Sequence, residues 1–98
     1  MNIGGLSEKK QVTNEINSIV KTLSDEILKK LNLDTNFIIE VHSYKSQIVA
    51  GIIYFLKIKV NNKYFHIKVM DYLPHENKAP QIISMQNEQS ESSEILYF

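Results

Sequence analysis

Residues 52–69 read IIYFLKIKVNNKYFHIKV, and this stretch decides the fold. Apolar residues take every second position on both sides of Asn61-Asn62, which is the period of a strand with one buried face. Asparagine tolerates the positive φ angle that a tight hairpin requires. The stretch therefore predicts two antiparallel strands joined at Asn61-Asn62. Their buried face consists of Ile52, Tyr54, Leu56, Ile58 and Val60, followed by Phe65, Ile67 and Val69.

Before this hairpin, the apolar residues follow the spacing of a helix. From Thr13 to about Leu31 they recur mostly at steps of three and four residues and occupy one helical face. The Thr13 hydroxyl can cap the first turn, and Lys29 and Lys30 suit the negative C-terminal end of the helix dipole. We expect one long helix that packs on the sheet through Ile16, Ile19, Val20, Leu23, Ile27 and Leu31.

Two further strands complete the predicted sheet. β-branched and aromatic residues dominate from Phe37 onward, after a polar break at 32–36, so one strand precedes the hairpin. Pro74 interrupts the ladder because proline has no amide donor, and a last strand lies near 81–86. The polar residues 87–93 predict a loop. This order predicts an α+β fold in which one helix packs across a four- to five-stranded antiparallel sheet.

The composition limits the classes of function. A length of 98 residues with 43% hydrophobic content predicts a single domain, residues 1–98. Basic and acidic side chains balance at 11 each, so no net field favours nucleic acid or an anionic membrane. The absence of cysteine excludes disulfides, thiolate metal sites and a cysteine nucleophile. No signal-peptide pattern or membrane-spanning run is present, so we expect a cytoplasmic location.

The histidines and lysines offer other functions. His42, His66 and His75 lack metal-ligand spacing, so no metal or cofactor is expected. We expect the first two on solvated or helix-edge strand faces and the third in a turn. Lysines alternate with aromatic residues over 54–68, as in some nucleic-acid-binding sheets. Alternating lysines are, however, the usual solvated face of a half-buried sheet. No nucleophile, base and orienting group can be assembled, so we expect no enzyme.

An apolar pentapeptide at 47–51, QIVAG, lies between two predicted strands, where a connection is normally polar. An uncharged apolar loop indicates a surface that is buried against a partner. In a meander, successive connections alternate between the two ends of the sheet. The 47–51 loop and the turn at 73–77 therefore fall at the same end, with Asn61-Asn62 at the other.

Three motifs occur in one order along the chain: Gly4-Gly5, the QIVAG loop at 47–51, and Leu73-Pro74. This set resembles the stefin family, the type 1 cystatins, over nearly the whole chain, and the aromatic ending at 94–98 is similar as well. The resemblance implies a cystatin-like fold. It also implies a reversible, tight-binding competitive inhibitor of papain-like (C1 class) cysteine proteases, including cathepsins.

The resemblance further implies how such an inhibitor binds. A flexible N-terminal trunk, residues 1–6, and the two loops occlude the active-site cleft of the protease, and glycines allow the backbone to approach closely. The implied binding residues are Ile3, Gly4, Gly5, Gln47, Ile48, Val49, Ala50, Gly51, Leu73, Pro74 and His75. The alternative is a noninhibitory protein-binding module with the same fold, because a fold does not fix a function.

The hairpin tip carries one more expectation. If Val49 is strained, the two strands beside it relieve that strain by straightening into one strand and exchanging the N-terminal half between two chains. We expect a monomer that forms a domain-swapped dimer on heating. The dimer buries the tip and loses inhibition.

Overall fold

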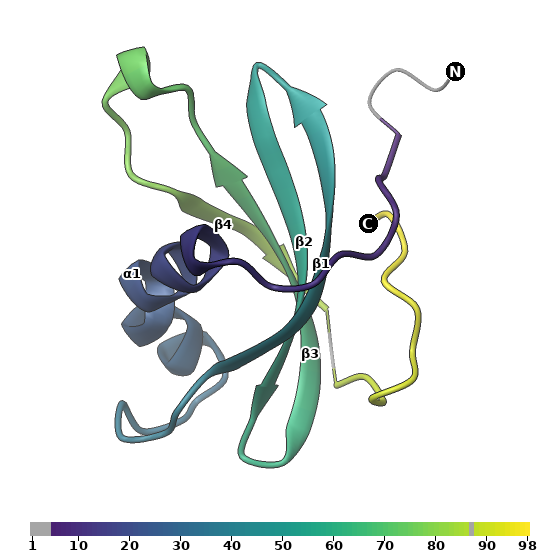
Figure 1. Cartoon of the computed structure of the whole chain (residues 1–98). Helices are drawn as coiled ribbons and strands as arrows, with labels where there is room; N and C mark the ends of the chain where they lie inside the picture. Colours follow the sequence, from purple (N-terminus) through teal and green to yellow (C-terminus); the bar gives the residue numbers. More distant parts are fainter. Residues whose placement is uncertain (1–4, 87) are drawn as a thin grey trace.

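The computed structural model describes residues 5–86 and 88–98. In these ranges the chain forms one α-helix and four strands: α1 (Asn14–Lys30), β1 (Glu40–Val49), β2 (Gly51–Val60), β3 (Lys63–Asp71) and β4 (Gln81–Met85). A short 3-10 helix, η1 (Pro74–Glu76), connects β3 to β4. The strands form one antiparallel sheet in chain order, and α1 packs on one face of it (Figure 1). The predicted α+β fold is therefore confirmed.

The helix begins and ends where its sequence predicts. Thr13 Oγ1 accepts a hydrogen bond from the Ile16 amide at 3.2 Å, which satisfies one of the free donors of the first turn. Asn32 follows the last turn with a φ of 59°, and this left-handed residue stops the helix. One face of α1 is buried against the sheet through Ile16, Ile19, Val20, Leu23, Ile27 and Leu28.

The β2–β3 hairpin has the predicted turn. Val60 pairs with Lys63, so two residues lie between the strands. Asn61 and Asn62 have φ angles of 52° and 62°, as a two-residue turn that matches the strand twist requires. The predicted apolar face lies toward α1, where Leu56, Ile58, Val60, Ile67 and Val69 are almost fully buried.

The outer face of the sheet is covered, although its lysines predict a solvated surface. Residues 88–98 run along this face, on the side away from α1 (Figure 1). Lys57 is only 3% exposed, and its Nζ donates to the carbonyl oxygens of Glu91, at 2.6 Å, and Ser93. Phe55 contacts the rings of Tyr97 and Phe98. The prediction of a solvated lysine face is wrong at Lys57, because a segment without strand or helix periodicity packs over it.

His66 is also buried on this face, where a solvated or edge position was predicted. Its side chain is 1% exposed, and Nδ1 lies 3.3 Å from Oε1 of Gln86. Within the described residues, Nε2 has no hydrogen-bond partner. Burial lowers the pKa of His66 and the Lys57 charge lowers it further, although the Gln86 contact opposes both. The imidazole is therefore neutral at neutral pH.

This burial predicts how stability depends on pH. Because the folded-state pKa of His66 lies below its ordinary value, the unfolded chain binds the proton first as the pH falls. The free energy of unfolding is therefore expected to decrease as the pH falls from about 7 into the acidic range. Urea titrations across this range measure the decrease, and His66→Leu should flatten it. The control His75→Leu, at an exposed position, should retain the slope. An unchanged slope in His66→Leu contradicts the assignment.

Candidate functional site

The first candidate loop is the tip of the β1–β2 hairpin, and it is shorter than predicted. Strand pairing continues until Val49 lies opposite Gly51, so only Ala50 is outside the strands. Gln47 and Ile48 belong to β1 and not to a loop, because their β-pairing with β2 is uninterrupted. The predicted five-residue loop is therefore wrong in its bounds. The structure places the turn at 49–51.

The tip is apolar and open to solvent. Ile48 is 70% exposed and Val49 is 41% exposed, and no charged residue lies between them and Gly51. Exposed apolar side chains gathered at one point are typical of contact surfaces. The positive φ at the tip, 122°, belongs to Gly51, and Val49 is not among the residues with a positive φ. The left-handed conformation at the tip is therefore taken by glycine and not by Val49.

Gly51 connects the tip to the rest of the site. A Cβ atom at this position would lie 2.6 Å from the carbonyl oxygen of Asp71 and 2.8 Å from Cε of Met70. Both the positive φ and the close approach require glycine. The tip therefore packs directly on the end of β3, where the chain continues into the second candidate loop.

The second candidate loop is a compact turn around Pro74. The Leu73 amide donates to Oε2 of Glu76 at 3.1 Å, and the Glu76 amide donates to the Leu73 carbonyl at 3.0 Å. Asn77 closes the turn with a φ of 52°. Leu73 is 39% exposed, and Pro74 and His75 are exposed beside it. The predicted turn at 73–77 includes Glu76 and Asn77 but gives them no role, although an acidic residue two positions after proline is a signal of such a turn.

The N-terminal segment approaches the same end of the sheet. Lys10 pairs with Tyr44 on the outer edge of β1, and the Ser7 amide donates to the Ser46 carbonyl at 2.8 Å. The segment thus runs antiparallel to β1 and brings the exposed Gly5 toward the hairpin tip. Figure 1 shows this segment, the tip and η1 at one end of the sheet and the β2–β3 turn at the other. Ile3 and Gly4 lie outside the described residues.

A hollow separates the tip from the second loop. Asp71 and Glu15 both line this hollow. Burial raises the pKa of the Asp71 carboxyl, and the charge of Glu15 raises it further. The hollow is lined by Glu15, Gly51, Ile52, Asp71, Tyr72, Leu73, Pro74, Asn77 and Lys78.

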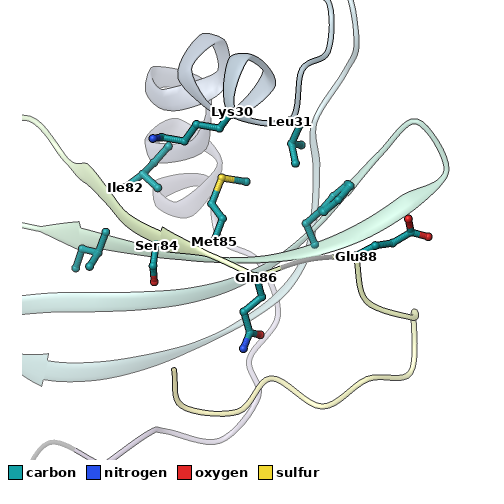
Figure 2. A pocket seen from close by; sticks show the side chains of 9 residues that line it. Lys30, Leu31, Ile82, Ser84, Met85, Gln86 and Glu88 are labelled. Carbon is teal, nitrogen blue, oxygen red and sulfur yellow. The ribbon is translucent and has the colours of Figure 1, made fainter.

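A second hollow lies between the C-terminal end of α1 and β4 (Figure 2). Met85 points from β4 toward α1, whereas Gln86 points to the opposite side of the sheet, where it meets His66. This hollow includes none of the residues of the two candidate loops or of the N-terminal segment, so it is not part of the candidate site.

The described part of the chain holds no group of three or more histidine, cysteine, aspartate or glutamate side chains placed to bind a metal ion. None of its helices combines the length and the apolar character needed to cross a membrane.

The contact at Gly51 gives a direct test of the site geometry. Gly51→Ala should lower the free energy of unfolding by about 1–3 kcal/mol, because it adds backbone strain and a clash with the Asp71 carbonyl. Ala50→Ser, at the exposed neighbouring position, should change it by less than about 0.5 kcal/mol. Urea unfolding compares the two variants. Equal effects would show that the close approach at Gly51 does not exist in solution.

The cystatin domain model matches residues 4–92. Stefin-C of Bos taurus is 34% identical over 99% of this chain and 96% of its own length. Leukocyte cysteine proteinase inhibitor 1 of Sus scrofa is 34% identical over 97% of this chain and 92% of its own length.

The fold agrees as well. The solved structure of a secreted type 1 cystatin from Fasciola hepatica superposes with a TM-score of 0.76 at 21% identity, covering 90% of this chain and 98% of that one. Because the family model and the relatives span almost the entire sequence, this chain belongs to the cystatin family and is a stefin-type member of it.

Proposed function

We propose that this chain is a reversible, tight-binding competitive inhibitor of papain-like (C1 class) cysteine proteases. As a member of the cystatin family, the chain is a protease inhibitor and not an enzyme. The observation that carries the finer proposal is the apolar edge at one end of the sheet, where Ile48, Val49 and Leu73 are exposed. The name of the Sus scrofa relative, leukocyte cysteine proteinase inhibitor 1, supports a cysteine protease as the target.

The edge is suited to filling a cleft. Inhibition of this kind requires that the active site be occupied, and it requires no reaction of the inhibitor. At the tip, strand pairing extends to Val49 and Gly51, and hydrogen bonds between Leu73 and Glu76 hold the second loop. Ordered loops lose little conformational entropy on binding, which leaves more of the contact energy as affinity. Protease–inhibitor interfaces of about 1,600 Å² include some of the tightest complexes.

Each candidate residue has a role in this proposal. The apolar side chains of the edge are desolvated at the centre of the interface, and residues 1–6 act as a trunk of the single domain 1–98. Ile3 enters a nonprimed pocket, and the glycine pair lets the backbone approach the enzyme. We also propose a cytoplasmic location and a monomeric state before binding. The set is Ile3, Gly4, Gly5, Gln47, Ile48, Val49, Ala50, Gly51, Leu73, Pro74 and His75.

Assays with papain and cathepsin L test the proposal. The purified chain should inhibit both in competition with a peptide substrate. Val49→Asp should raise the inhibition constant about 100-fold, mainly through faster dissociation, because it places an unpaired charge in a desolvated contact. The matched control is Ile83→Asp: Ile83 is a similarly exposed apolar residue, 48%, on β4. The Ile83→Asp variant should inhibit both proteases as strongly as the wild type.

Two outcomes contradict the proposal. Full protease activity at micromolar concentrations of the chain refutes inhibition, and a pull-down that then recovers only nonprotease partners favours a noninhibitory binding module. Equal inhibition by Val49→Asp and the wild type removes the tip from the site.

The hairpin tip also bears on oligomeric state. Because only Ala50 lies outside β1 and β2, a small change at the turn would merge the two strands into one and exchange α1 and β1 between chains. Heating is expected to convert monomer into a swapped dimer without inhibitory activity, because the tip no longer exists in it. Size-exclusion chromatography of a heated sample, with each fraction assayed on papain, checks this. A dimer with full activity rules out the swap at this turn.

A further inference from the structure

The N-terminal segment contacts β1 in an irregular register. Lys10 and Tyr44 exchange two backbone hydrogen bonds, at 2.8 and 3.2 Å, as an opposed pair in an antiparallel ladder does. In a regular ladder the next such pair would be Glu8 with Ser46. Instead, the Ser7 amide donates to the Ser46 carbonyl at 2.8 Å. Two residues, Ser7 and Glu8, thus face one residue of β1, which is the arrangement of a β-bulge.

The Ser7 hydroxyl completes this bulge. Its Oγ accepts a hydrogen bond from the Ser46 amide at 2.9 Å, so it takes the place of the Glu8 carbonyl of a regular ladder. The same hydroxyl donates to that Glu8 carbonyl at 2.8 Å. Ser46 is 8% exposed, and its amide would lose its acceptor without the hydroxyl or a change of register. The side chain therefore satisfies both backbone groups that the irregular register leaves free.

The register determines which residue lies beside the hairpin tip. Because the two segments are antiparallel, Gly5, two residues before Ser7, lies level with the exposed Ile48, two residues after Ser46. A regular ladder would place Leu6 at that level, and a shift of one residue also moves every side chain of the segment to the other face. The bulge thus brings a residue without a side chain to the edge.

We propose that Ser7 is a positioning residue for inhibition: its hydroxyl sets the register of the N-terminal segment and so brings Gly5 level with the hairpin tip. This role rests on the proposed function. Ser7 acts through Gly5 and the residues before it, and it does not itself need to touch the protease. The hydroxyl is required, whereas the bulk of the side chain is not.

A double-mutant cycle tests the role. Ser7→Ala should raise the dissociation rate from papain about tenfold, because the Ser46 amide loses the hydroxyl acceptor that favours this register. In a chain that lacks residues 1–4, the same substitution should change this rate less than about twofold, since most of the trunk that Ser7 positions is then absent. Ser7→Thr, which keeps a hydroxyl, should restore most of the wild-type rate.

The control is Ser46→Ala. It removes the 3.4 Å contact between Lys10 Nζ and Ser46 Oγ but keeps the amide that Ser7 holds, so inhibition should be unchanged. NMR contacts across the two segments report the register without a protease: Ser7 faces Ser46 in the wild type, and Glu8 should face it in Ser7→Ala.

The outcomes separate the two proposals. If the wild type inhibits papain and Ser7→Ala dissociates at the wild-type rate, the positioning role is wrong and the proposed function stands. If Ser7→Ala is equally damaging without residues 1–4, Ser7 supports the structure and does not position the trunk. A wild-type chain that leaves papain active overturns the proposed function and this role with it.

Discussion

Strand β2 is paired along its length with β1 on one side and β3 on the other, and this double pairing determines where the other elements lie. The inner side chains of β2 form the floor on which α1 packs, and its outer side chains lie under residues 88–98. Its first residue, Gly51, approaches the Asp71 carbonyl so closely that no side chain fits. The distance between the two candidate loops is therefore set by the sheet itself and does not depend on loop flexibility.

The outer face shows how polar groups are accommodated under a segment without regular structure. Removing a lysine ammonium group from water is costly unless hydrogen bonds replace the lost hydration. Carbonyl oxygens of residues 91 and 93 supply these bonds to Lys57, and the carbonyl of Phe98 accepts one from Lys68 at 2.6 Å. The same contacts hold the C-terminal segment on the sheet, with Ile95 at 2% exposure as its apolar anchor. His66, buried without a partner for Nε2 among the described residues, is the least satisfied group in this layer.

Local patterns were sufficient for much of the fold. The Thr13 cap, the helical spacing and the Asn61-Asn62 turn each depend on residues close in sequence, and all three were predicted. Strand counting also predicted that the two loops share one end of the sheet. The burial of Lys57 could not be predicted, because it depends on a segment more than thirty residues away that has no periodicity of its own. The apolar composition of residues 47–51 likewise could not predict which of them belong to the strands and which form the turn.

The register at Ser7 belongs to the same class of feature. The hydropathy pattern cannot predict that a serine hydroxyl replaces a backbone carbonyl. This contact forms only when two segments distant in sequence lie side by side. The consequence for binding is an edge with parts of unequal order. The tip and the turn at Pro74 are held by strand pairing and by the hydrogen bonds of Glu76, whereas the N-terminal segment is held on β1 through Ser7 and Lys10. A rigid part loses little entropy on binding and fits clefts of one shape, while a lightly held part can adjust at some entropic cost. Under the proposed function, differences in affinity between proteases with similar clefts should therefore arise mainly in the N-terminal segment, which only the contacts of Ser7 and Lys10 align with β1.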